Sequence, residues 1–276
     1  MNNNQTPVSS KIYDEEYYLA NCDGFNLFDK FEGQKLSARL EYAWRIANVQ
    51  PGMTMLDIGV GRGETVYQGY KVCAKTFGID FSIASVKIAQ SVISNQRLPG
   101  SLVQADAKHI PFQDEIFDRV LMFDIVEHLY DWELEKVYRE AWRLLKPGGQ
   151  IIIHTAPNLW YYQFGYPLYR IIESLRGKKL PANPRDRFRF HKTHVNEQSI
   201  LTLRKDLKKS GFQVRTWLVH IPKEGVSPPW LIQLVSPILY NLPPLLWIFR
   251  NDVFAVAIKE INENSVYIQP VKQKLD

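Results

Sequence analysis

Short apolar runs alternate with helix-length amphipathic stretches over residues 51–156. This alternation is typical of a doubly wound sheet, in which helices cover both faces of parallel strands. The runs at 56–59 and 151–155 are apolar without alternation, as expected of strands buried on both sides. The predicted strands are 53–58, 76–79, 102–103, 119–123 and 150–155, with helices near 63–72, 83–94 and 131–145. The pattern therefore predicts an α/β fold.

Composition divides the chain into five segments around this core. Residues 1–50 are expected to form an N-terminal cap ending in a leading helix, because apolar residues recur there at three- and four-residue spacing. The core spans 51–156, and an aromatic and basic lid follows at 157–195. The C-terminal part of the sheet is predicted at 196–260, and a tail follows at 261–276. Within 196–260 we expect a helix from 196 to about 210, strands at 212–221 and 252–258, and an apolar insertion between these strands at 222–251.

The overall composition fits a globular protein of 276 residues, since 45% of them are hydrophobic. The two cysteines, Cys22 and Cys73, form no C-x-x-C pair, so we expect neither a disulfide framework nor a cysteine-based metal site. Residues 1–10 lack the basic and apolar regions of a signal peptide. We therefore expect a cytoplasmic protein.

Candidate chemistry begins where the first predicted strand ends. Asp57 is followed by a glycine-rich turn containing Gly59 and Gly61, which lets a ligand approach the backbone closely. Asp80 ends the second strand, where a carboxylate can accept hydrogen bonds from ribose hydroxyls. Asp106 follows the third strand. Three acids at successive strand ends point to a nucleoside-bearing ligand.

The sequence resembles the class I S-adenosylmethionine-dependent methyltransferases of the small-molecule type, which include quinone-biosynthesis enzymes. The blocks that carry the resemblance cover roughly residues 50–156 in order: LDIGVGRGE at 56–64, GIDFS at 78–82, QADAKHIPFQDEIFDRV at 104–120, FDIVEHL at 123–129 and RLLKPGGQIIIHT at 143–155. The resemblance implies a Rossmann-like seven-stranded sheet of order 3-2-1-4-5-7-6, with the seventh strand antiparallel. It also implies S-adenosylmethionine as methyl donor, with no metal.

The resemblance assigns roles in holding the cofactor to the first two strand ends. Asp57 would orient the glycine turn and the methionine end, while Gly59 and Gly61 let the backbone approach. Asp80 would hold the ribose, with Phe81 against the adenine.

Two further strand ends complete the implied cofactor site. Asp106 and Ala107 would meet the adenine edge, and Asp124 would lie beside the methyl-donating centre. The alternative for Asp124 is a cap of the following helix. The alternative cofactor is a nicotinamide dinucleotide, but Glu64 stands where its fingerprint needs a last glycine.

A general base is needed only where the acceptor must lose a proton. His128 and His194 are the candidates, because the histidine pKa lies near neutrality. The alternatives are that His128 packs beneath the lid and that His194 fixes the lid to the next helix. Tyr13, Tyr17 and Tyr18 would either close over the cofactor or simply pack.

The acceptor is predicted from the segments outside the core. Residues 170–192 contain eight basic and two acidic side chains, and 226–249 contain no charge but five prolines, which disfavour a spanning helix. We predict O-methylation of a glycan or lipid-linked intermediate at the cytoplasmic membrane face, with an anionic membrane surface as partner and the protein peripheral on it. The alternatives are a soluble secondary metabolite or quinone precursor as acceptor, and a non-catalytic sensor or scaffold that binds the cofactor. Nucleic acid is not expected, since no RNA-binding module accompanies the domain.

Overall fold

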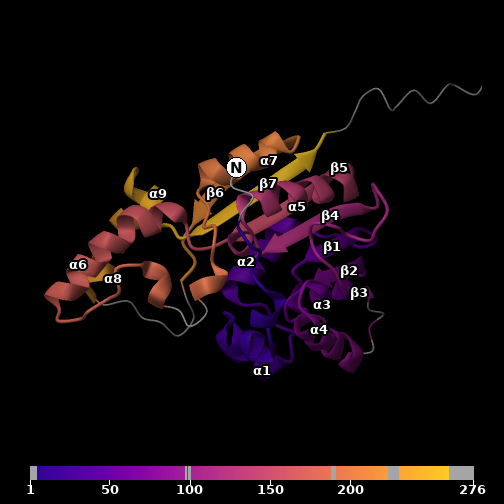
Figure 1. Cartoon of the computed structure of the whole chain (residues 1–276), viewed down its shortest axis with the longest axis horizontal. Coiled ribbons are helices and arrows are strands. Elements are labelled where there is room, and N and C mark those ends of the chain that lie inside the picture. Colours follow the sequence, from indigo (N-terminus) through magenta and orange to yellow (C-terminus); the bar gives the residue numbers. More distant parts are fainter. Residues whose placement is uncertain (1–4, 97, 99–100, 188–190, 223–229, 261–276) are drawn as a thin grey trace, which may run out of the picture.

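A seven-stranded sheet organises the computed structural model, which describes residues 5–96, 98, 101–187, 191–222 and 230–260 (Figure 1). The strand order is β3-β2-β1-β4-β5-β7-β6. The strands are β1 (Thr54–Ile58), β2 (Lys75–Asp80), β3 (Ser101–Gln104), β4 (Phe117–Phe123), β5 (Leu145–Thr155), β6 (Phe212–Val219) and β7 (Asp252–Lys259). This confirms the predicted Rossmann-like order.

The first five strands are parallel, and β7 runs antiparallel to both of its neighbours. In the register, Ile152 of β5 faces Val256 of β7, and Trp217 of β6 faces Phe254. The predicted antiparallel pair at the sheet edge is thus present. Because the parallel strands all end at one edge, their terminal side chains share that edge.

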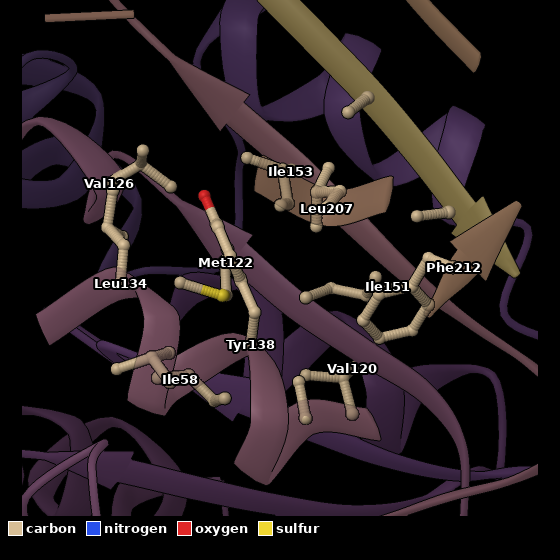
Figure 2. Packing of buried hydrophobic residues seen from close by; sticks show 14 of the residues in the cluster. Ile58, Val120, Met122, Val126, Leu134, Tyr138, Ile151, Ile153, Leu207 and Phe212 are labelled. Carbon is tan, nitrogen blue, oxygen red and sulfur yellow. The ribbon is translucent and has the colours of Figure 1, made fainter. Parts of the chain in front are cut away.

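Helices cover both faces of the sheet. Figure 2 shows Tyr138 of α5 (Asp131–Leu144) and Leu207 of α7 (Ile200–Lys209) packed against Met122 and Ile151 of the central strands. On the other face, α2 (Ala38–Ala47) packs against β4 and β5. Burial on both faces explains why these strands are apolar without alternation.

Two further helices flank the glycine-rich turn. They are α3 (Glu64–Lys71) and α4 (Ile83–Asn95), and they contact each other and strand β2. Gly63 begins α3 with φ 87°, and a Cβ built on it would lie 2.8 Å from the Cβ of Ala89 on α4. Only a glycine therefore permits this close approach of the two helices.

The N-terminal cap contains three short helical pieces before α2. These are a 3₁₀ turn at Ser10–Ile12, a π-helical turn at Tyr17–Asn21 and α1 (Phe25–Phe31). Arg62 joins this cap to the core, since its Nη2 donates to the carbonyl oxygen of Asp23 at 2.7 Å. The leading helix of the cap is confirmed as α2, which lies on the sheet.

Helices α6 (Tyr166–Leu175), α8 (Trp230–Asn241) and α9 (Leu245–Phe249) project from one end of the sheet (Figure 1). A π-helical turn at Tyr161–Gly165 precedes α6 and contacts α9. Among the described residues, no helix has both the length and the apolar character to cross a bilayer. The predicted tail at 261–276 and the residues at 223–229 of the apolar insertion lie outside the described residues.

Several predicted boundaries were wrong by one to five residues, and three of them have a clear physical reason. Helix α7 begins at Ile200, not at 196, because the hydroxyl of Ser199 caps it by accepting from the amide of Thr202. Strand β6 ends at Val219, and the amide of Ile221 donates instead to Asp252. Strand β5 begins at Leu145, since the proline–glycine turn at 146–149 lies within the extended run.

Candidate functional site

Asp57 occupies the end of β1 beneath the glycine-rich turn. Its side chain is buried and accepts a hydrogen bond from the hydroxyl of Thr65. Burial raises the pKa of Asp57 to about 7, and the nearby carboxylates of Asp80 and Glu64 add to the effect. A positively charged ligand at this point would therefore stabilise the ionised form.

Asp80 ends β2 and lies against the same turn. Its Oδ2 accepts from the amide of Gly61 at 3.1 Å, and its Oδ1 accepts from the amide of Ser82 at 2.8 Å. Gly59 and Gly61 have φ values of 79° and 54°, which favour glycine. A carboxylate with two oxygens has capacity for further hydrogen bonds, so Asp80 can also receive hydroxyl groups.

The residues that follow the end of β3 lie close to those that follow the end of β2. Lys108 pairs with Asp106 at 3.1 Å, and its Nζ lies 6.0 Å from the centre of the Phe81 ring. Phe81 is 43% exposed, which leaves an aromatic face open beside Asp106. Ala107 is partly buried and packs against the main core instead.

Asp124, at the end of β4, is the centre of a charged network. Its Oδ2 lies 2.9 Å from Nη2 of Arg39, and its Oδ1 lies 2.6 Å from Nδ1 of His154, whose Nε2 lies 3.2 Å from Oδ1 of Asp252. Although burial opposes it, these cations hold the pKa of Asp124 below its ordinary range. The N-cap of the next helical turn is Ile125, so Asp124 does not cap it.

Both candidate histidines lie just beyond this network. Nδ1 of His128 is 2.9 Å from the carbonyl oxygen of Thr193, and the rings of His128 and His194 meet edge to face at 4.8 Å. Burial lowers the pKa of His128, and burial together with the neighbouring His128 lowers the pKa of His194 to about 3. Both rings are therefore neutral at pH 7. Next to them, burial and Asp124 raise the pKa of Glu127 to about 7.

The tyrosines of the cap cover this edge of the sheet. The hydroxyl of Tyr18 lies 3.5 Å from Oδ1 of Asp80, and the ring of Tyr13 meets that of His128 at 5.7 Å. Tyr17 packs edge to face on both other tyrosines. The cap therefore spans the distance from the Asp80 end of the edge to the histidine end.

A cavity of about 410 Å³ opens beside His194. Its lining includes Tyr130, Asn183, Arg185 and Lys192. Arg185 is engaged with Glu197, its Nε lying 2.8 Å from Oε1 of that residue. The cavity thus lies between His194 and the basic segment of the lid.

The sequence analysis missed four charged or titratable residues at this edge: Arg39, Glu127, His154 and Asp252. His154 carried a signal, because it is the polar residue within an otherwise apolar buried run. Arg39 and Asp252 carried none, since their neighbourhood depends on how the cap and β7 pack. Only the fold brings them to Asp124.

Comparison with known sequences finds a family model that matches part of the core. Residues 56–153 match the family described as "Methyltransferase domain". Sterol methyltransferase-like 3 of Botryococcus braunii is 34% identical over 133 residues, which are 44% of this chain and 33% of that protein. Demethylmenaquinone methyltransferase of Oceanobacillus iheyensis is 28% identical over 167 residues, 55% of this chain and 69% of that protein. The chain thus spans about a third of the length of the Botryococcus relative.

Solved structures share the fold at low sequence identity. Phosphoethanolamine N-methyltransferase 2 of Haemonchus contortus, in complex with phosphomonomethylethanolamine and S-adenosylhomocysteine, is 19% identical, with a TM-score of 0.57. The similarity covers 93% of this chain and 59% of that one. At this identity the likeness concerns the class I architecture.

Proposed function

Since residues 56–153 form a methyltransferase domain on a class I sheet, we propose that the protein is an S-adenosylmethionine-dependent methyltransferase of small-molecule acceptors. One observation carries the proposal: the carboxylates of Asp57 and Asp80 lie at neighbouring strand ends around a turn whose glycines adopt positive φ. The relatives named for sterol and demethylmenaquinone methylation support a small-molecule acceptor.

The residues at the strand ends fit this cofactor chemically. Asp80, fixed by the amides of Gly61 and Ser82, retains acceptor capacity for ribose hydroxyls. A Cβ on Gly61 would have its nearest neighbour, the carbonyl oxygen of Gly59, at 3.9 Å, so its surroundings are open. The acidic set favours a cationic, hydroxyl-bearing ligand over a polyphosphate, which carboxylates would repel.

The remaining positions complete the proposed cofactor site. Phe81 would lie against the adenine, and Asp106 and Ala107 would meet its edge. Asp57 would face the methionine end, where a positive charge would favour its ionised form. Asp124, held by Arg39 and His154, would be the nearest carboxylate to the reacting centre.

When bound, S-adenosylmethionine would supply a methyl group carried on a positively charged sulfur, and the sulfur would keep the electron pair of the broken carbon–sulfur bond when the acceptor atom attacks the methyl carbon. The chain's part is to hold the acceptor in line and exclude water, which is worth up to about 7–11 kcal/mol. The Tyr13 to Tyr18 segment covers the edge of the sheet and would exclude water there. The low pKa of His194 makes it a weak base, which favours an orienting role.

Calorimetry with S-adenosylmethionine tests the cofactor site. We expect the wild-type protein to bind it, and Asp80→Ala to weaken binding by about tenfold or more, because charge-assisted bonds are worth about 1.5–3 kcal/mol each. Asp29→Ala, which removes an exposed carboxylate from α1, is the matched control and should bind normally. An Asp80→Ala protein with unchanged affinity would overturn the assignment.

For the acceptor, we propose O-methylation of a glycan or lipid-linked intermediate at the cytoplasmic membrane face. The lining of the cavity beside His194 includes Lys192, whose ammonium group suits an acceptor bearing a phosphate or carboxylate. Elsewhere in the lid, Glu173 neutralises part of the basic segment by pairing with Arg176 and Lys178. Arg185 also lines the cavity but is paired with Glu197, so Lys192 is the cation on which this proposal relies.

Exposed apolar side chains support a membrane surface as partner. Leu168, Ile171 and Leu175 form a stripe along α6 and are 48%, 60% and 85% exposed. Leu234 and Ile238 on α8 are 68% and 54% exposed at four-residue spacing. Helices with one apolar exposed face bind the interface of a bilayer without spanning it.

Flotation with phosphatidylglycerol vesicles tests the membrane surface. We expect the wild-type protein to float at low salt and the Leu234→Glu/Ile238→Glu double variant to remain in solution. Leu201→Glu on α7, where the side chain is 61% exposed, is the control and should float like wild type. A wild-type protein that stays unbound at low salt removes the membrane from the proposal.

Transfer of a labelled methyl group into cell extract identifies the acceptor class. Label in a lipid-linked or glycan fraction supports the proposed acceptor. Label confined to a soluble metabolite or quinone precursor supports that alternative instead. Cofactor binding without any transfer would indicate a sensor or scaffold.

A further inference from the structure

Three metal-ligating side chains converge beside the proposed cofactor site. They are Glu127 and His128, which follow β4, and His194, which lies near the end of the lid. One ligand atom of each lies within 4.8 Å of the others. The family resemblance implied no metal, and the three residues lie on two segments far apart in the sequence, so the set was not predicted.

Backbone hydrogen bonds hold the two contributing segments together. The amides of Val195 and Asn196 donate to the carbonyl oxygen of Glu127 at 2.9 and 3.1 Å. The side-chain amide of Asn196 donates to the carbonyl oxygen of Leu129 at 2.9 Å. The fold therefore holds the backbone that follows His194 against the backbone of Glu127 and Leu129.

The hydrogen bonds of the individual ligands match those of metal sites. His128 Nδ1 faces the carbonyl oxygen of Thr193 at 2.9 Å, so in the neutral ring this nitrogen carries the hydrogen and Nε2 keeps a lone pair. Metal-binding histidines are oriented in this way by a carbonyl or carboxylate. The hydroxyl of Thr155 donates to Oε2 of Glu127 at 2.7 Å and orients that carboxylate as well.

The charges around the cluster suit a cation. Glu127 brings a carboxylate to two imidazoles, a donor set that a divalent cation would complete. Asp124 adds a second carboxylate in the vicinity. The nearby cations Arg39 and Arg185 are each paired with an acid.

From these contacts we propose that Glu127, His128 and His194 bind one divalent transition metal ion of the zinc class. Two imidazoles and one carboxylate suit Zn²⁺ better than the all-oxygen shells that Mg²⁺ and Ca²⁺ prefer. Ligand atoms about 2.1 Å from a tetrahedral ion lie about 3.4 Å apart, so side-chain rotations of modest size complete the site. The cavity beside His194 gives the ion a route of entry and a place for a fourth ligand.

The proposal deepens the proposed function without depending on it, since a cation here would lie between the cofactor site and the acceptor cavity. A bound ion would orient an acceptor oxygen as its fourth ligand. The alternative is that the two histidines only fix the lid to the core. A purely structural histidine pair would bind no metal.

Titration of the chelator-treated full-length protein tests the site. We expect ZnCl₂ to bind in calorimetry with one ion per chain, and CoCl₂ to give the visible absorption of a four-coordinate ion. His194→Ala should weaken Zn²⁺ binding at least about tenfold, and Glu127→Gln should do likewise. His109→Ala, which removes an exposed histidine, is the matched control and should bind like wild type.

The outcomes separate the metal site from the methyltransferase proposal. Absence of saturable Zn²⁺ and Co²⁺ binding, binding of MgCl₂ alone, or equal affinity in His194→Ala and wild type would each overturn the metal site. S-adenosylmethionine binding is measured on the same samples, so loss of one site is seen independently of the other. Because His194 is only partly buried, its variant remains informative where Glu127→Gln fails to fold.

Discussion

Nδ1 of His154 lies 2.6 Å from Oδ1 of Asp124, and the same buried ring reaches Asp252 with its other nitrogen. One imidazole thus joins the ends of β4 and β7 across β5. Asp124 has φ 56°, a left-handed conformation that non-glycine residues rarely adopt. We infer that the ion pairs with His154 and Arg39 hold Asp124 in this conformation, with its carboxylate at the functional edge.

Replacing His154 with glutamine should therefore destabilise the fold. Burial opposes a charged ring, but the two aspartates raise the pKa of His154 to about 9, so it is a cation at neutral pH. Removing it leaves two acids facing each other, at a cost of about 3–5 kcal/mol in the free energy of unfolding. Urea denaturation measures the loss, with the partly exposed His220→Gln as control. A loss below about 1 kcal/mol would contradict the ionic assignment.

The same residue predicts how stability depends on pH on the alkaline side. Its pKa is about 9 in the folded protein and about 6.5 when unfolded, so folding favours the protonated ring. The stabilisation is complete below about pH 6.5 and is lost as the pH rises through 9, by at most about 1.4 kcal/mol per pH unit. Denaturation between pH 6 and 10 should show this fall in wild type and a smaller fall in His154→Gln. Equal slopes in both proteins would refute it.

Asp57 predicts a second fall in stability, at lower pH. Its pKa is raised from 3.8 to about 7, so the folded protein favours the protonated acid and loses stability as the pH rises from about 4 to 7. Asp57→Asn should reduce that slope in the ligand-free protein. Asp118→Asn is the opposite-sign control, because Lys146 and the amide of Thr54 lower the pKa of Asp118. Glu127 shares the window, so the measurement is the difference between variant and wild type.

Alanine substitutions at two glycines should separate the stability lost through backbone strain from the stability lost through crowding of the added Cβ. Gly63 and Gly177 both have positive φ, 87° and 79°, but an added Cβ at Gly63 meets Ala89 at 2.8 Å while one at Gly177 meets nothing within 4 Å. Alanine at Gly177 should cost about 1–2 kcal/mol from the left-handed conformation alone. Alanine at Gly63 should cost about 1–3 kcal/mol more, because α3 and α4 must move apart. Equal losses in urea denaturation would show that the helices adjust freely.

The strand order was predictable because the family resemblance over residues 50–156 implies it. The strands of that region are short apolar runs that can be recognised locally in the sequence. The carboxylates at the strand ends were predictable for the same reason: Asp57, Asp80 and Asp124 each end an apolar run. Their roles toward a ligand remain predictions.

The partners of these carboxylates were not predictable from the sequence. Arg39 reaches Asp124 from the cap, and Asp252 reaches His154 from β7, 98 residues further along the chain. Likewise, His194 meets Glu127 and His128 through backbone bonds between segments far apart in sequence. Such pairings depend on tertiary packing, which leaves no local pattern in either segment.

Replacing Arg62 should lower the free energy of unfolding, and a second substitution at Glu64 should restore part of the loss. The guanidinium of Arg62 pairs with Glu64 at 3.1 Å, and both side chains are buried. Arg62→Met leaves the Glu64 carboxylate without this cation and should cost about 3–5 kcal/mol, whereas Arg62→Met/Glu64→Leu removes both charges and should recover more than half of the loss. Urea denaturation of the two variants gives the comparison, and a double variant no more stable than Arg62→Met would show that the lost stability does not come from the unpaired carboxylate of Glu64.

Cleavage of the cap by a protease distinguishes the two contacts of Arg62, its ion pair with Glu64 and its hydrogen bond to Asp23. Nη2 of Arg62 also donates to the carbonyl oxygen of Asp23 at 2.7 Å, and this bond is lost in both variants. Trypsin should therefore cleave the cap, at Lys30 or Lys35, faster in the single and the double variant than in wild type. The double variant should regain stability against global unfolding without regaining the bond to Asp23. Its free energy of unfolding should therefore approach that of wild type while its cap is still cleaved faster than in wild type. If cleavage slows in parallel with the recovered stability, the cap is held by the core as a whole and not by Arg62.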